Sequence, residues 1–326
     1  MTRQLVASYI FAALATTLLP LSVGAQPPDV EFKPTEARIP VGTTSLFARV
    51  VGSGRAVIVL HGGPDFDQSY FLPDLDQMKD GFRLIYYDQR GRGKSAEHVR
   101  PEDVTLLSDV DDLGRVSQYF RLDAPVLLGH SWGAVLALEY ALRYPTRVSY
   151  LILMNPAPVS TSDVAVMRKA YRETLGVDLE RQHKLIASAA YQRGDPDAVI
   201  ARYRIHFEHA LARVEDYEKL MARMQAGFIA QGKGGIIEAR AVEDQLMRDT
   251  WDVASYDLLP KLRDLRVPTL IIAGDHDFIP PAIAEHIAQS IPNAHLVTIK
   301  DCGHFAFLEC AADVRNAIDK FFRRAR

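Results

Sequence analysis

Short apolar runs bounded by polar or glycine-containing turns recur along most of the chain, and this pattern is typical of buried strands. The runs are "AVIVLHG", "FRLIYYD", "PVLLGH", "VSYLILMN", "PTLIIAGD" and "AHLVTIK", and the earlier segments "TEARIPV" and "TSLFARVVG" are also expected to be strands. Stretches with helical spacing of apolar residues, such as "EDVTLLSDVDDLGRVSQYF" and "AVLALEYALRY", lie between several of them. Strands that alternate with helices predict an α/β protein whose mostly parallel sheet is covered by helices on both faces.

The pattern changes between residues 156 and 252. The segments "AVMRKAYRETL", "ERQHKLIASAAYQR", "AVIARYRIHFEHALARVEDYEKLMARM" and "GGIIEARAVEDQLMRD" are all expected to be helical, and no strand-like run separates them. The sequence therefore predicts an α/β core formed by residues 26–155 and 253–326. Residues 156–252 are expected to form a helical insertion in this core.

The first 25 residues carry a different signal. Arg3 precedes the uncharged apolar run "LVASYIFAALATTLLPLSVG", and small residues lead up to Gln26. We expect residues 1–25 to be a signal peptide cleaved after Ala25, and the mature protein to be periplasmic or secreted. The run is also about long enough to cross a bilayer as an uncleaved anchor, although Pro20 disfavours a stable helix there.

Composition and charge narrow the function. The 326 residues are 48% hydrophobic and 24% charged, as in an ordinary globular protein. A net charge of −3 gives no electrostatic footprint for nucleic acid. Nothing in the spacing of Cys302 and Cys310 resembles a zinc site. We expect two unpaired thiols, and a disulfide in an oxidising compartment is the alternative.

The segment "VLLGHSWGAVLAL" places Ser131 between two glycines, where a predicted strand meets a predicted helix. A sharp turn at this junction needs Gly129 and Gly133, because larger side chains would collide there. The turn lifts the hydroxyl above the carboxyl edge of the sheet, beside the positive end of the helix. We therefore expect Ser131 to be a nucleophile; the alternative is a serine that only builds the turn.

A serine nucleophile needs a base that is held by an acid. His304 follows the last predicted strand in "DCGHF" and is the expected base, whereas His61 is expected to shape a turn. The two histidines of "HFEHA" lack the further ligands of a metal site, so no metal is expected. In "LIIAGDHDF", Asp277 lies further into the loop than Asp275 and is the expected acid. Asp275 is expected to bond local backbone N–H groups.

The oxyanion formed by nucleophilic attack needs two preorganised N–H donors, each typically worth ~10²–10³ in rate. One is expected to be the backbone N–H of Trp132, directly after the serine. The other is expected from "HGGP", where glycines let the backbone approach a substrate, and we assign it to Gly63. The alternative for "HGGP" is a plain tight turn.

The motifs "LHGGP", "YYDQRGRGKS", "GHSWG", "GDHD" and "CGH", in this order, resemble the α/β-hydrolase fold. More narrowly, they resemble the proline iminopeptidase group, and the resemblance covers nearly all of the mature chain outside the insertion. It implies that Ser131, Asp277 and His304 are nucleophile, acid and base, in the chain order known for this fold. It also implies that the helical insertion is a cap over the active site.

The sequence departs from this group at two points. Asp65 follows "HGGP" where relatives usually have glycine. Cap glutamates bind the free amine of the substrate in those peptidases, and Glu208 and Glu238 are the residues expected to do so here, with Glu243 as a further candidate. The surrounding cap motif is absent, so the alternative is that all three are solvated.

The sequence thus predicts a serine hydrolase that cleaves a small amide or peptide, as a proline iminopeptidase does. An esterase or lactonase with the same three residues is the first alternative. A catalytically silent binding protein on the same scaffold is the second. We expect no metal or organic cofactor, a small-molecule or short-peptide substrate, no nucleic acid, and no membrane contact after signal cleavage. The sequence leaves the oligomeric state open.

Overall fold

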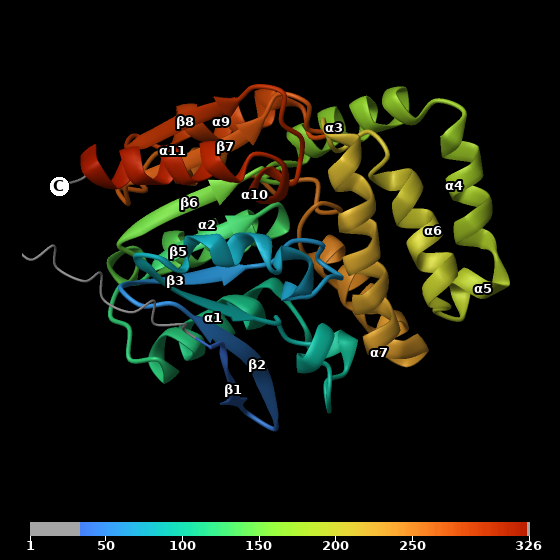
Figure 1. Cartoon of the computed structure of the whole chain (residues 1–326), viewed down its shortest axis with the longest axis horizontal. Coiled ribbons are helices and arrows are strands. Elements are labelled where there is room, and N and C mark those ends of the chain that lie inside the picture. The colour runs from blue at the N-terminus through green and yellow to red at the C-terminus, as the bar shows by residue number, and fades with distance from the viewer. Residues whose placement is uncertain (1–32, 325–326) are drawn as a thin grey trace, which may run out of the picture. The chain divides into compact units, whose positions relative to one another are not determined.

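The computed structural model describes residues 33–324, so the predicted signal peptide lies outside the described residues. An eight-stranded sheet has the order β1-β2-β4-β3-β5-β6-β7-β8 (Figure 1). Its strands are β1 (Thr35–Val41), β2 (Thr44–Val51), β3 (Arg55–Leu60), β4 (Phe82–Tyr87), β5 (Val126–His130), β6 (Tyr150–Met154), β7 (Thr269–Gly274) and β8 (Ala294–Ile299). β2 pairs with β1 and β4 in antiparallel fashion, and every other pairing is parallel.

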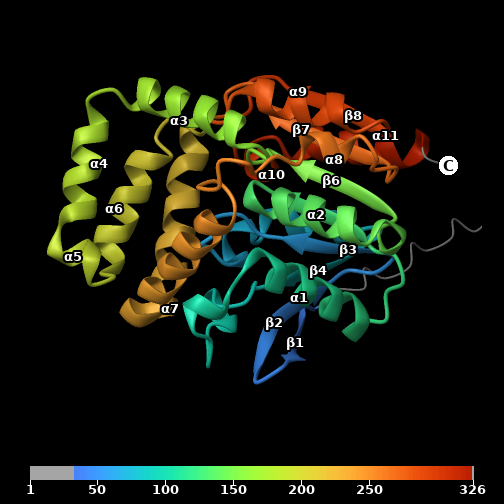
Figure 2. The ribbon, with the colours of Figure 1, turned by 180° about the vertical axis from the view of Figure 1, so that it is seen from behind.

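Helices cover both faces of the sheet, as the alternating pattern predicts (Figures 1 and 2). They are α1 (Leu106–Tyr119), α2 (Trp132–Arg143), α8 (Leu259–Leu262), α9 (Pro281–Ser290), α10 (Ala306–Glu309) and α11 (Ala311–Arg324). Two buried apolar clusters lie on opposite faces. In β5, Leu127 belongs to one cluster while Val126 and Leu128 belong to the other, because successive strand residues point to opposite sides. A strand buried on both faces explains the unbroken apolar run.

A group of helices is inserted between β6 and β7, and we call this group, α3 to α7, the cap. Its members are α3 (Thr161–Leu175), α4 (Asp178–Ala187), α5 (Ala189–Gln192), α6 (Pro196–His206) and α7 (Val214–Asp249). They lie beyond the carboxyl ends of the parallel strands (Figures 1 and 2). The two ends of the insertion meet, because Ser160 and Asp257 form an isolated antiparallel bridge. The N–H of Leu258 also donates to the carbonyl of Val159 at 2.9 Å.

The prediction that "AVIARYRIHFEHALARVEDYEKLMARM" is helical throughout is wrong in one part. α6 ends at His206 and α7 begins at Val214, so residues 207–213 form a loop. This loop packs on the core: the carbonyl of Ala210 accepts a hydrogen bond from the N–H of His304 at 2.6 Å. Contacts with the core at this point outweigh helix propensity, which is a weak local preference. Within residues 33–324, no helix is long and apolar enough to cross a bilayer.

Candidate active site

Ser131 lies in the turn between β5 and α2, with φ 52° and ψ −119°. Non-glycine residues rarely adopt this conformation, and it persists only where the surroundings enforce it. A Cβ added to Gly129 would lie 2.3 Å from the carbonyl oxygen of Gly133. A Cβ on Gly133 would lie 2.2 Å from that of Leu60. The strained turn therefore requires glycine at both positions, as the sequence indicates.

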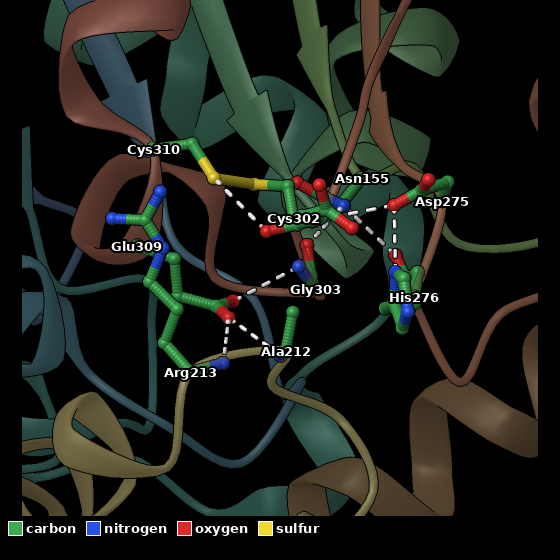
Figure 3. The surroundings of a disulfide bond; sticks show 11 residues. Asn155, Ala212, Arg213, Asp275, His276, Cys302, Gly303, Glu309 and Cys310 are labelled. Atoms are coloured by element: carbon green, nitrogen blue, oxygen red, sulfur yellow. Dashed lines mark hydrogen bonds and ion pairs between the residues drawn. A yellow bond between two sulfur atoms is a disulfide. The ribbon is translucent and has the colours of Figure 1, made fainter.

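His304 and Asp277 form a buried pair at the same edge of the sheet. His304 Nδ1 lies 2.9 Å from each carboxylate oxygen of Asp277, and the two side chains are only 3% and 4% exposed. Asp275 does not contact His304; its Oδ1 bonds His276 Nδ1 at 2.7 Å and the N–H of Cys302 at 3.3 Å (Figure 3). The structure thus brings Asp277, rather than Asp275, to the histidine.

Asn155 orients this carboxylate through a contact that the sequence pattern alone does not predict. Its Nδ2 donates to Asp277 Oδ2 at 2.9 Å and to the carbonyl of Gly303 at 3.1 Å. The residue directly follows β6 at φ 46°, a left-handed conformation that asparagine tolerates better than most residues. An asparagine at the carboxyl end of a predicted strand is the signal that could have revealed it.

Ser131 and His304 line one cavity with a free volume of about 120 Å³. Its walls are largely aromatic and include Phe66, Phe207 and Phe278. Within residues 33–324 no hydrogen bond joins Ser131 Oγ to His304, a contact that is often looser in substrate-free hydrolases.

The backbone N–H groups of Gly63 and Trp132 remain the candidate donors to an oxyanion. Gly63 lines the cavity at φ 117°, and a Cβ there would lie 2.4 Å from the backbone nitrogen of Asp65. The N–H of Gly62 is already used, because it donates to Tyr70 Oη at 2.7 Å. Trp132 is the first residue of α2, where a backbone N–H has no acceptor within the helix. The geometry therefore favours Gly63 over Gly62 as the second donor.

A cluster of ionisable side chains closes the cap side of the cavity. Asp65, Arg202, Tyr203 and Glu243 all line it, and Tyr203 donates a hydrogen bond to Asp65. Burial raises the pKa of Asp65. Burial, together with the charge of Asp65, raises the pKa of Glu243 to about 8. Arg202 opposes both shifts, and its Nε is buried without an acceptor among the described residues.

The structure brings neither Glu208 nor Glu238 to this cavity, so Glu243 replaces them as the candidate carboxylate. Glu208 is exposed in the loop that interrupts the cap helices. Glu238 is exposed on α7 and borders a different, outer groove. Glu243 is five residues further along α7, which turns its side chain by about 140° around the helix.

The other candidate histidines have structural partners. His61 Nε2 accepts the N–H of Gln89 at 3.0 Å, and burial lowers the pKa of His61 to about 3. His206 lines the cavity and shares a hydrogen bond with the hydroxyl of Tyr171 at 2.6 Å. No group of three or more His, Cys, Asp or Glu in the described part of the chain is arranged to hold a metal.

Cys302 and Cys310 form a disulfide, so the expectation of unpaired thiols is wrong (Figure 3). Two cysteines separated by eight positions in the sequence do not reveal whether the chain between them folds back. The bridge encloses the segment that carries His304. Within it, Glu309 Oε1 accepts the N–H of Gly303 at 3.1 Å, and Glu309 Oε2 accepts that of Ala212 at 2.7 Å.

Known proteins match this chain over most of its length. Residues 55–311 match the family model of the alpha/beta hydrolase fold. The chain is 29% identical over 271 residues to a proline iminopeptidase of Saccharolobus solfataricus, covering 80% of this chain and 82% of the relative.

Two solved structures share the fold. A proline iminopeptidase-related protein from Thermus thermophilus has a TM-score of 0.67 at 23% identity, covering 89% of this chain and 98% of its own. An N-acyl homoserine lactone degrading enzyme has a TM-score of 0.66 at 20% identity, covering 87% and 100%. These matches confirm the predicted fold class and the resemblance to proline iminopeptidases. The chain belongs to the α/β-hydrolase fold family and is a hydrolase.

Proposed function

We propose that the protein is a serine hydrolase that cleaves small amides or peptides through an acyl-enzyme on Ser131. His304 takes the hydroxyl proton as Oγ attacks the substrate carbonyl carbon, and Asp277 holds and stabilises the resulting imidazolium. The N–H groups of Gly63 and Trp132 donate to the oxyanion. His304 then gives its proton to the leaving amine, and a water molecule releases the acyl group by the same steps.

The observation that carries this proposal is the convergence of Ser131 and the Asp277–His304 pair on one small cavity. Each part alone has a structural explanation, since strained turns and buried histidines occur elsewhere. A strained serine, a histidine fixed by a buried carboxylate and two backbone N–H groups beside them together make up an acyl-transfer site.

For the acyl group, we propose a residue with a free amino terminus. Two acids, Asp65 and Glu243, and one base, Arg202, line the cavity, and Arg240 acts on both acids from outside this lining. A substrate ammonium therefore completes the charge balance, because its arrival allows the second carboxyl group to release its proton. The name of the proline iminopeptidase relative supports the same substrate class.

An esterase or lactonase is the second candidate, and Arg202 is the observation that favours it. Its guanidinium offsets one carboxylate, and a Glu243 pKa of about 8 leaves that side chain largely neutral at neutral pH. A neutral cluster accommodates an uncharged acyl group as well. One structural neighbour is an N-acyl homoserine lactone degrading enzyme, which agrees with this interpretation.

The test is a panel of prolyl arylamide, N-acetylprolyl arylamide and p-nitrophenyl acetate, together with labelling by a fluorophosphonate. We expect the prolyl arylamide to have the highest kcat/KM of the three. Ser131→Ala should abolish labelling and lower turnover by up to ~10⁶, because the three residues act as a unit.

Ser290→Ala, at a half-buried position at the end of α9 and outside the lining of the cavity, is the matched control and should change neither. Preference for the ester over both amides would favour the second candidate. If the wild-type protein is not labelled by the fluorophosphonate and hydrolyses none of the substrates, the silent binding protein would be the remaining candidate.

A further inference from the structure

A buried chain of hydrogen bonds connects the three loops of the site. The N–H of Gly62 lies 2.7 Å from Tyr70 Oη, which lies 2.8 Å from His130 Nδ1. His130 Nε2 lies 2.9 Å from the carbonyl oxygen of His304. Gly62 precedes the oxyanion donor, His130 precedes Ser131, and His304 is the candidate base. One end of this series of hydrogen bonds is therefore the residue next to the oxyanion donor, and the other end is the candidate base itself.

The direction of every bond in this chain is fixed. A carbonyl oxygen only accepts, so His130 Nε2 must carry the proton. In a neutral imidazole the other nitrogen is then an acceptor, and Tyr70 must donate to His130 Nδ1. Since the hydroxyl has one proton, it meets Gly62 with a lone pair and accepts that N–H. All three contacts are satisfied by one tautomer of His130 and one orientation of the Tyr70 hydroxyl.

The surroundings keep the chain in this state. Tyr70 and His130 are 2% and 1% exposed. Burial, and to a lesser extent the nearby His304, lowers the pKa of His130 well below its usual value, so the ring stays neutral. Burial likewise raises the pKa of Tyr70 well above its usual value, so the hydroxyl keeps its proton. Stacking on Phe71, at 4.3 Å between ring centroids, holds the tyrosine ring in place.

We propose that Tyr70 and His130 are positioning residues. They set the distance between the loop that carries Gly63 and the loop that carries His304, on either side of Ser131. The inference rests on the proposed serine-hydrolase function. Neither side chain takes part in proton transfer. They act because the backbone of His304 is held at both ends, its N–H by Ala210 at 2.6 Å and its carbonyl by His130 at 2.9 Å.

Tyr70→Phe is the first test, because it removes one oxygen atom and keeps the aromatic packing. We expect kcat per active site, counted by fluorophosphonate titration, to fall about 10–100-fold, since displacement of reacting groups by about 1 Å can cost 10² in rate. KM should stay within about threefold. The affinity for a boronic acid that mimics the tetrahedral intermediate should fall by the same factor as kcat/KM, as expected for a loss confined to the transition state.

Tyr86→Phe is the matched control, because Tyr86 is a buried tyrosine that donates to Asp76 at 2.9 Å. It should lose thermal stability but keep kcat and boronate affinity. Equal losses of kcat in the two variants would show a general effect of stability and overturn the proposal. Unchanged kcat in Tyr70→Phe would overturn it as well. An inactive, unlabelled wild-type protein would instead refute the underlying function.

Two changes at His130 separate its bonds. His130→Gln places an amide N–H near the position of Nε2 and retains a donor to the His304 carbonyl. His130→Asn places an oxygen near the position of Nδ1 and retains only the acceptor for Tyr70. We expect the glutamine variant to keep more activity per labelled site than the asparagine variant. The opposite order would show that the bond to His304 has no positioning role.

Discussion

At the scale of single residues, the least expected feature is the charge cluster on the cap side of the cavity. The same cavity of about 120 Å³ is lined by Asp65, Glu243 and Arg202. Two acids and one base in a buried space favour retention of a proton, because a second unpaired carboxylate is costly there. That proton makes the proposed binding of an amine dependent on pH.

Binding of an ammonium substrate should improve as pH rises from 6 toward 8.5, because Glu243, with a pKa of about 8, becomes the carboxylate the ammonium needs. We expect KM for a prolyl arylamide to fall over this range and Glu243→Gln to remove the fall and raise KM at pH 8. Dividing the KM of the variant by that of the wild type at each pH cancels titration of the substrate's own amine.

The control is Glu238→Gln, which changes an exposed carboxylate on the same helix. It should leave the pH profile as it is. A profile of p-nitrophenyl acetate hydrolysis that responds to Glu243→Gln in the same way would contradict a role in amine binding.

At the scale of elements, a short segment holds core and cap together. Glu309, in α10, is 2% exposed, and its carboxylate accepts the N–H groups of Gly303, Ala212 and Arg213 (Figure 3). The first of these belongs to the loop of His304, and the other two belong to the loop between α6 and α7. One carboxylate thus replaces the helical hydrogen bonds that the interrupted cap segment gives up.

Glu309→Gln should destabilise the protein by about 1–3 kcal/mol, because an amide nitrogen would then face backbone N–H groups and leave buried donors unsatisfied. Denaturant unfolding measures this change. Glu218→Gln, at an exposed position on α7, should cost less than about 0.5 kcal/mol. Equal stabilities of the two variants would show that the contacts of Glu309 contribute little.

The central strands were predictable because they are apolar runs buried on both faces, as in β5 and β7, whereas the edge strands β1 and β8 are partly exposed. Ser131 was predictable because its turn requires glycine on both sides, where any side chain would collide with the backbone. This requirement appears in the sequence as a short motif. The break at residues 207–213 was not, since it depends on contacts with His304 and Glu309, which are far away in sequence. The role of Tyr70 was not predictable for the same reason, because its partners Gly62 and His130 lie in separate segments of the sequence.

At the scale of the whole molecule, we propose that the protein works outside the cytoplasm. The disulfide between Cys302 and Cys310 supports this, because such bonds persist in oxidising compartments and are rare elsewhere. Mass spectrometry of the protein from its native host should find an N-terminus at Gln26 in the periplasmic or secreted fraction. Protein that begins at Met1 and stays in the cytoplasm would contradict the proposal.

The bridge between Ser160 and Asp257 has an evolutionary meaning. Because the inserted helices leave and rejoin the sheet at neighbouring points, they can lengthen, shorten or be replaced while β6 and β7 keep their pairing. The reacting groups belong to the core, whereas the insertion carries Arg202, Tyr203 and Glu243. A lineage built this way can acquire new substrates by exchanging one cassette, and its inherited chemistry continues to work beneath each new version.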